Sequence, residues 1–456
     1  MRLATIAGAA GVVLAATIAP AHAANTLFDD VSPLTGANVP IPVGSYMEGT
    51  NAFLLPSGPG VTITQTSIAD RGMQLSLGQG NTGSWDMIDT NRTGPDANRY
   101  LFMPFETGTP MSGMQRVDLW TGQTTTLVNP GTQGWARADA SRWSPWGTWL
   151  GGEENFTPGQ TGTGRLFEVT NPVTATQGNG TLVQRNSVVP LVSHEGLAFD
   201  SANNFYFIDE NSSGSFYKFT SANPNAANGS DFFGAGTVFA AIVPGGAHGS
   251  ANGVANTTGA LTWAQVSGLD GRAAADAVNA SAWNRPEDME IKTLAGGGEM
   301  IVFAATGTDE AYSVNLATNE VKVFASQSTI NIETGMAVGG LFNDPDNIAI
   351  DAAGNFYIVE DQETPNADVW LAKDADNDGV AEYVQRWVAM QVTGAEPSGL
   401  FFSLSDPNLA YINIQHADSG NDRTIMLAAV PEPTTYAMML AGLGMIGFLA
   451  RRRLRG

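Results

Sequence analysis

The sequence contains no cysteine among its 456 residues. Disulfides therefore cannot stabilise the protein, and no thiolate can bind a metal ion or act as a nucleophile. Basic residues are few, with 21 Lys and Arg against 44 Asp and Glu, which gives a formal net charge of −23 at pH 7. This charge argues against nucleic acid as a partner, because phosphates require basic side chains. It suits divalent cations, which prefer oxygen ligands, although most of the acids serve to keep the surface soluble.

Long helical periodicity is also hard to find. Two common catalytic motifs are missing as well. No Gly-x-Ser-x-Gly nucleophile elbow and no Walker-type phosphate loop is present. Short apolar runs such as Asn204–Ile208 and Glu299–Ala304 are bounded by Gly, Asn, Asp and Pro, and Gly totals 53 residues. Such runs are typical of strands between turns. The sequence therefore predicts an all-β fold.

The N-terminus has the features of a secretory signal peptide. Met1-Arg2 is followed by an apolar stretch from Leu3 to Ile18 and then by small residues at Ala21 and Ala23. We expect signal peptidase to cleave after Ala23, so residues 1–23 are absent from the mature, exported protein.

The C-terminus carries three features in a fixed order. Pro431-Glu432-Pro433 is followed by an apolar run from residue 434 to 450 and by a basic tail over 451–456. The apolar run is short but long enough for a transmembrane helix, and the arginines would stay cytoplasmic. The pattern resembles the PEP-CTERM sorting signal, which a membrane peptidase of the exosortase family recognises; an ordinary tail anchor is the alternative. We expect membrane anchoring before processing and a cell-surface or extracellular location afterwards.

An internal repeat organises the domain that lies between these signals, residues 24–428. The segment Ala198–Glu210 resembles Ala349–Asp361, and each copy predicts a β-hairpin. An acid precedes the first strand of each copy, Glu195 in one and Asp346 in the other. Weaker copies begin at Arg285 and Glu396. Repeated units of this kind predict a β-propeller, with six blades and a long insertion over residues 221–279.

In a propeller, an acid before each innermost strand would face the central channel. Several carboxylates at close range cannot all ionise unless cations neutralise them. The repeat therefore predicts a metal site in the channel; the alternative is that the acids cap turns.

Several short strings, in a shared order, resemble the PhoX alkaline phosphatase family. They are Trp146–Leu150 with Glu153-Glu154-Asn155, Arg285-Pro286-Glu287, Pro345-Asp346-Asn347 and Asn413–His416. The resemblance covers roughly residues 144–418. It implies a six-bladed propeller that hydrolyses phosphomonoesters with iron and calcium in its channel.

The resemblance assigns roles to particular residues. Glu153, Glu195 and Glu287 would be metal ligands, and Arg285 would bind phosphate, with Glu287 also catalytic. Glu154 and Asp346 are further candidate metal ligands. His194 could orient Glu195 or bind phosphate, and the alternative is a structural histidine. Carboxylates bind hard cations, and the arginine fork matches phosphate oxygens.

One position departs from the family pattern. The family commonly has a cysteine as an iron ligand directly before the Glu-Glu pair, where this sequence has Gly152. A thiolate-bound iron centre therefore cannot form, which leaves calcium alone or iron bound by carboxylates. Three functions follow: a calcium-dependent phosphomonoester hydrolase, a non-catalytic propeller that binds extracellular matrix or a partner, and a lactonase-like calcium enzyme.

A separate acidic loop contains Asp374, Asp376 and Asp378, followed by Gly379. This spacing matches the start of a calcium-binding loop, although the twelfth position is Gln385 rather than Glu. We expect calcium binding on a propeller turn, with a polar hairpin turn as the alternative.

Overall fold

The computed structural model describes residues 26–35, 51–108, 111–361, 367–392, 394–432, 438–446 and 451. Strands dominate, which confirms the all-β prediction. The helical segments within the described part of residues 26–432 are short: α1 (Arg71–Ser76), α2 (Gly229–Phe232), α3 (Gly271–Ala277) and the 3-10 turns η1 (Leu27–Asp30), η2 (Thr132–Gly134), η3 (Thr306–Thr308) and η4 (Gly339–Leu341).

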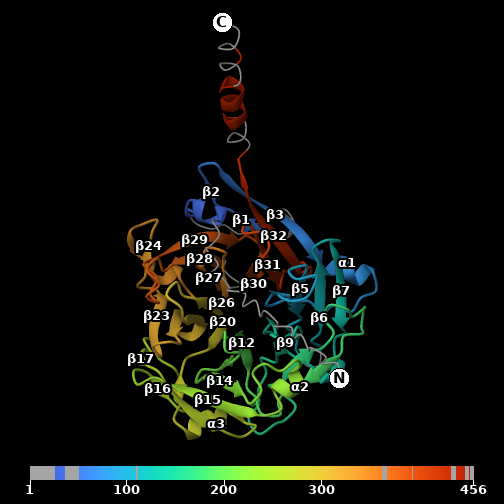
Figure 1. The fold of residues 1–456 in the computed structure, drawn as a ribbon, viewed down its shortest axis with the longest axis vertical. Coiled ribbons are helices and arrows are strands. Elements are labelled where there is room, and N and C mark those ends of the chain that lie inside the picture. Colours follow the sequence, from blue (N-terminus) through green and yellow to red (C-terminus); the bar gives the residue numbers. More distant parts are fainter. Residues whose placement is uncertain are drawn as a thin grey trace, which may run out of the picture.

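Six sheets of four or more strands follow one another around a common axis, so the fold is a β-propeller and each sheet is a blade (Figure 1). Blades 1 to 3 contain, from the axis outward, β4 (Asp89–Thr90), β5 (Tyr100–Pro104), β6 (Met114–Asp118) and β7 (Gln123–Val128); β8 (Arg142–Trp143), β9 (Trp149–Gly152), β10 (Leu166–Val169) and β11 (Leu182–Gln184); and β12 (His194–Phe199), β13 (Phe205–Asp209), β14 (Phe216–Ser221), β15 (Gly236–Ile242) and β18 (Thr262–Val266).

Blades 4 to 6 have the same antiparallel order of inner strands. They contain β20 (Pro286–Thr293), β21 (Glu299–Ala305), β22 (Glu310–Asn315), β23 (Glu320–Ser326) and β17 (Gly259–Ala260); β26 (Pro345–Ile350), β27 (Phe356–Glu360), β28 (Asp368–Lys373) and β29 (Tyr383–Met390), edged by β1 (Phe53–Leu54), β24 (Ile330–Asn331) and β25 (Met336–Ala337); and β30 (Glu396–Phe402), β31 (Leu409–Gln415), β32 (Arg423–Pro431), β3 (Val61–Asp70) and β2 (Ser57–Gly58). A two-stranded sheet joins β16 (Ala247–His248) to β19 (Ser281–Ala282).

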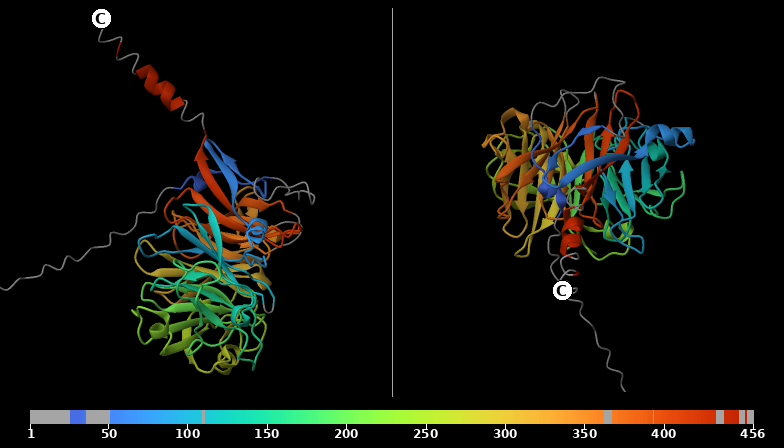
Figure 2. Two further views of the ribbon diagram at one scale, coloured as in Figure 1. Left: turned by 90° about the vertical axis from the view of Figure 1, so that its right-hand side faces the viewer. Right: turned by 90° about the horizontal axis from the view of Figure 1, so that it is seen from above.

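Blade 6 closes the ring by joining the two ends of the domain. Strand β3, from the N-terminal part of the chain, pairs along its length with β32, from Val61 opposite Pro431 to Asp70 opposite Arg423 (Figure 2). Pairing of distant segments leaves no gap between the first and last blades, so the inner strands surround the axis completely.

The blades pack through apolar side chains that alternate along the strands. Between blades 3 and 4, for example, Phe216, Phe303 and Tyr312 are fully buried and their rings stack at centroid distances of 5.6 and 5.4 Å. Each such ring contributes about 1.5–3 kcal/mol of burial free energy. The repeat that predicted hairpins forms them, with Leu197 opposite Phe207 and Ile348 opposite Ile358.

Two boundaries differ from the sequence-based expectation. Residues 221–279 are not simply an insertion, because β15 and β18 complete blade 3 and β17 joins blade 4. The buried Val238, Ala240 and Val266 explain why these strands form despite the Ala- and Gly-rich composition. The propeller also extends past residue 428, since β32 continues to Pro431 and Glu432 N–H donates to the Gly60 carbonyl.

The predicted terminal signals lie partly outside the described residues. The signal peptide with Ala21 and Ala23, and also Pro433, fall outside them. Residues 438–446 of the predicted transmembrane span are helical and exposed, whereas 434–437 and 447–450 are not described. Among the described residues, no helix is both long and apolar enough to cross a membrane.

Candidate metal centre in the channel

Five of the six blades place a carboxylate at one equivalent position of the innermost hairpin. This position follows the first cross-strand pair of each hairpin, which is Trp85–Phe105, Ala138–Glu153, His194–Asp209, Pro286–Ala305 and Pro345–Glu360 in blades 1 to 5. The five carboxylates are Asp86, Asp139, Glu195, Glu287 and Asp346. In blade 6 the first pair is Glu396–Gln415 and the register shift comes later, after Ser398; judged by that shift the equivalent residue is Gly399, and the acid Glu396 lies three residues earlier. We call these six acids the carboxylate ring.

A register shift follows the first pair in blades 3 to 5, as between His194 and Leu197 or between Pro286 and Met289, and in blade 6 a shift follows the third pair, between Ser398 and Phe401. Such β-bulges re-aim side chains and occur often beside functional sites. The bulge is therefore part of the repeated backbone geometry that presents an acid at the channel.

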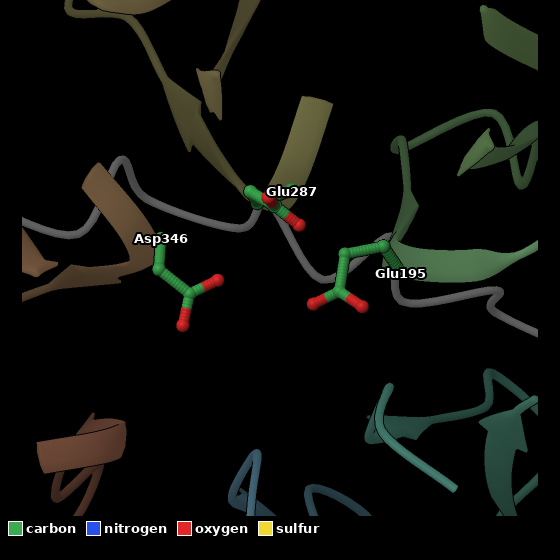
Figure 3. Close-up of side chains that lie close together, drawn as sticks. All are labelled: Glu195, Glu287 and Asp346. Atoms are coloured by element: carbon green, nitrogen blue, oxygen red, sulfur yellow. The ribbon is translucent and has the colours of Figure 1, made fainter. Parts of the chain in front are cut away.

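Three members of the ring converge on one point (Figure 3). Glu195, Glu287 and Asp346 come from the inner strands of consecutive blades, and one oxygen of each lies within 4.8 Å of the others. Glu195 is 1% exposed and Glu287 is 3% exposed. We call these three residues the channel cluster.

The hydrogen bonds of the channel cluster leave oxygens free. Glu287 Oε1 accepts a hydrogen bond from the Thr306 hydroxyl, at 2.6 Å, and Asp346 Oδ2 accepts one from the Asn347 amide, at 3.1 Å. Neither oxygen of Glu195 accepts a hydrogen bond from an N–H or hydroxyl group of the described residues, and the side chain with which it can share a proton is another ring acid, Asp139. A buried carboxylate without partners is costly unless a cation neutralises it.

The electrostatics of the ring agree with this geometry. Burial raises the pKa of Glu195 well above its usual value, and the neighbouring Glu287 and Asp346 raise it further. The pKa values of Glu287 and Asp346 are raised in the same way, by burial first and by nearby carboxylates second. Burial likewise raises the pKa values of Asp86, Asp139 and Glu396. The ring therefore disfavours its own negative charges, which a bound cation would neutralise.

The backbone is strained where the chain enters the ring. In five blades the residue two positions before the ring acid has a positive φ. Four of these residues are not glycine, namely Ser84, Arg137, Arg285 and Asp344, and the fifth is Gly394. Positive φ is uncommon for such residues and concentrates at functional sites. Arg285 lies here, 44% exposed, and its Nε donates to Glu210 at 2.6 Å while an NH2 nitrogen lies 3.3 Å from Glu287.

Further along the channel, an ion pair crosses between blades. The buried Arg142 of blade 2 donates to Glu290 of blade 4 at 2.8 Å and to the Met289 carbonyl at 3.1 Å. The ion pair joins blades 2 and 4, which lie on either side of blade 3. It is on the opposite side of the channel cluster from Arg285. We call the end of the channel beside the half-exposed Arg285 the mouth.

Two residues of the predicted site lie away from the cluster. Glu153 forms a bidentate ion pair with Arg165, at 2.6 and 2.8 Å, and both of its oxygens also accept backbone N–H groups. His194 is fully buried and packs on Phe207, with ring centroids 5.5 Å apart, and burial lowers its pKa to about 3. The structure thus places Glu153 in an ion pair within blade 2 and His194 in the packed interior, whereas Glu154 lies near the mouth, 3.7 Å from Arg137.

The position of Gly152 has a structural reason. A Cβ atom on Gly152 would lie 2.2 Å from the His194 Cβ, so the buried histidine occupies the space that a side chain would need. A cysteine at this position would not fit without movement of β12.

The predicted calcium loop is the turn between β28 and β29, and its acids are arranged differently from the expectation. Asp374, Asp376 and Glu382 bring one oxygen each within 4.8 Å of one another. Asp378 instead lies 3.3 Å from the Lys322 ammonium group. The loop acids have donors already, since Asp374 accepts from the Asp378 and Gly379 N–H groups and Glu382 accepts from Ala375 N–H.

Three ring residues were not predicted as site residues, namely Asp86, Asp139 and Glu396. Glu396 begins a recognised copy of the repeat, so the repeat itself carried the signal. Asp86 and Asp139 stand in Trp-Asp-Met and Ala-Asp-Ala, which share no flanking residues with the other copies. Their equivalence is visible only in the strand register.

Comparison with known proteins identifies the sorting motif. Residues 429–453 match the model of the PEP-CTERM protein-sorting motif. The match confirms the motif at Pro431-Glu432-Pro433 and implies export, processing by exosortase and sorting to the cell surface. No curated protein matches the chain.

Solved structures resemble the chain only remotely. A catalytically inactive variant of virginiamycin B lyase from Staphylococcus aureus is 10% identical, with 81% of this chain and 100% of that chain covered and a TM-score of 0.42. A provisionally assigned phosphatase from Bacteroides thetaiotaomicron is 9% identical, with 77% of this chain and 72% of that chain covered and a TM-score of 0.45. A PQQ-bound aldose sugar dehydrogenase from Streptomyces coelicolor is 11% identical, with 82% of this chain and 99% of that chain covered and a TM-score of 0.39. Resemblances this remote carry no argument about activity.

Proposed function

We propose that this exported propeller is a metal-dependent phosphomonoester hydrolase that binds a divalent cation at Glu195, Glu287 and Asp346. The observation that carries the proposal is the buried, unpartnered carboxylate of Glu195 beside two further acids. The donor set is made of carboxylate oxygens, which suits a hard cation, and calcium is the first candidate. Iron held by carboxylates is the second, because no thiolate is available.

A cation at this site would supply Lewis-acid polarisation of a phosphoryl oxygen and a bound water of lowered pKa. The side chains provide the remaining functions. The half-exposed Arg285 presents a planar fork that matches phosphate oxygens. Thr306 and Asn347 hold Glu287 and Asp346 in fixed orientations. Residues that keep a site fixed in this way reduce the reorganisation needed for reaction.

The test uses the full chain, supplied with calcium or with iron, and a chromogenic phosphomonoester. Glu287→Gln keeps the shape and removes the charge, and we expect kcat/KM to fall by about 100-fold or more, because a metal ion contributes several kcal/mol of charge stabilisation. Glu320→Gln, at the exposed start of β23, is the matched control. Unchanged hydrolysis in Glu287→Gln would contradict the proposal.

A second candidate is a non-catalytic propeller, stabilised by calcium, that binds extracellular matrix or a partner. The packing of His194 against Gly152 favours it, because this packing removes the place of the family's cysteine ligand. Stoichiometric metal binding without phosphomonoester turnover would support this candidate.

A further inference from the structure

Arg137 and Arg285 occupy equivalent positions in blades 2 and 4. Each lies two residues before a ring acid, Asp139 in one blade and Glu287 in the other, and both have positive φ, 45° and 49°. Blade 3 lies between them and supplies Glu195. The two guanidinium groups therefore belong to the mouth on either side of blade 3 and its Glu195.

The neighbours of Arg137 show that it faces this mouth. Its NH1 nitrogen lies 3.9 Å from Glu106 and 3.7 Å from Glu154. Both glutamates interact electrostatically with Asp86 of the ring, and Glu154 also interacts with Arg285. Arg137 is thus connected through Glu154 to the arginine on the far side of blade 3.

The guanidinium of Arg137 is not committed to structural hydrogen bonds. Its side chain is 52% exposed, its two ion pairs are longer than a hydrogen bond, and its side chain donates no hydrogen bond to any described residue. The other described arginines of the propeller do donate hydrogen bonds; Arg99 and Arg272, for example, each form two bonds to one carboxylate. A strained, half-exposed arginine with its donors free is suited to an external anion.

We propose that Arg137 binds a second anionic group of the substrate, so that the site prefers phosphomonoesters that also carry a carboxylate or a further phosphate. The inference rests on the proposed function, in which Arg285 binds the phosphoryl group that reacts. The field of the carboxylate ring repels anions from the mouth. A second arginine offsets that repulsion only for substrates with a second charge in reach, which makes Arg137 a specificity-determining residue.

The experiment compares two ligands of nearly equal size, the hydrolysis-resistant phosphonate analogues of phosphoglycolate and of ethyl phosphate (named below by their parent esters), by calorimetry on the calcium-loaded full chain. We expect the wild type to bind phosphoglycolate more tightly. Arg137→Gln should weaken phosphoglycolate binding by about 10- to 100-fold, the range for a hydrogen-bonded charged group, and leave ethyl phosphate unchanged. Arg137→Lys should keep part of the preference. Lys322→Gln, which removes one positive charge from the outer strand β23, should leave the affinity for both ligands unchanged.

Four results would overturn the inference: no preference in the wild type, an equal loss for both ligands, no loss in Arg137→Gln, or no binding of either ligand. The readout is independent of turnover. If the preference is present without hydrolysis, the proposed function fails alone, and if hydrolysis is present without the preference, only the role of Arg137 fails.

Discussion

The described residues contain two groups of three carboxylates, each with one oxygen per residue within 4.8 Å of the others, in opposite surroundings. In the channel cluster, Glu195 and Glu287 are buried and Glu195 has no donor; in the loop cluster of Asp374, Asp376 and Glu382, two acids are exposed and backbone N–H groups serve as donors. The loop can exist without a cation because water and the backbone already satisfy its acids. The channel cluster lacks these partners, so its stability depends on a cation or on protonation.

The largest expected effect is on the channel cluster. Calcium at about 100 times its Kd should stabilise the wild type by about 2.7 kcal/mol, and Glu195→Gln should abolish this stabilisation. In chelator the order should reverse, because the wild type must either bury the charge of Glu195 or protonate it, at a cost of about 1–3 kcal/mol that the variant does not have. Thermal unfolding of both proteins, with and without calcium, measures this. A variant that still responds fully to calcium would place the cation elsewhere.

A comparable effect is expected from pH. Glu195, Glu287 and Asp346 have pKa values raised above 4.5, 4.5 and 3.8, so the folded metal-free protein holds protons that the unfolded chain releases. Their contribution to stability is therefore complete below about pH 4 and is lost as the pH rises through the folded-state pKa values. Calcium competes with these protons, and the increase in Tm that it causes should grow between pH 5 and pH 8. A calcium effect independent of pH would argue against these three ligands.

A smaller effect is expected where the sequence departs from the PhoX pattern. Gly152→Cys should lower the free energy of unfolding by about 1–3 kcal/mol, because the new side chain would collide with His194 in a packed interior. Adding His194→Ala should recover part of the loss. Urea denaturation of the single and double variants measures the coupling. A stable Gly152→Cys protein that binds iron would show that the centre can be rebuilt, against this expectation.

The smallest effect is expected in the loop. The double variant Asp376→Asn with Glu382→Gln removes two exposed charges and should change the free energy of unfolding by less than about 1 kcal/mol. Its phosphomonoester turnover should equal that of the wild type. A large loss of calcium-dependent stability in this variant would reverse the comparison and make the loop the structural site.

The sequence predicted much of the fold because the repeat is local. Glu195 and Asp346 lie at the start of hairpins whose alternating apolar residues are readable from the chain, and the propeller follows from these repeated hairpins. The completion of blade 6 by β3 was not predictable, because that pairing joins residues far apart in the chain. Strands β15 and β18 were missed because their small residues gain burial only from blade packing.

The candidate site was predictable to a similar degree. Glu195 and Asp346 could be named from the repeat and Glu287 from the resemblance to the PhoX family, and the structure brings these three together. It places each as the second residue of its strand rather than before the strand. The separation of Glu153 from Glu154 could not be read from the sequence, because it depends on Arg165 reaching Glu153 across blade 2. Arg137 was missed because its equivalence to Arg285 lies in the backbone conformation, not in the neighbouring residues.

The most direct test of the central claim is the metal content of three purified full-length proteins: the wild type, Glu195→Gln, and Asp376→Asn with Glu382→Gln. The account predicts that the wild type retains calcium or iron through extensive dialysis, that the loop variant retains the same tightly held metal, and that Glu195→Gln loses it. Equal metal content in the wild type and Glu195→Gln would contradict the assignment of the channel cluster as the metal centre.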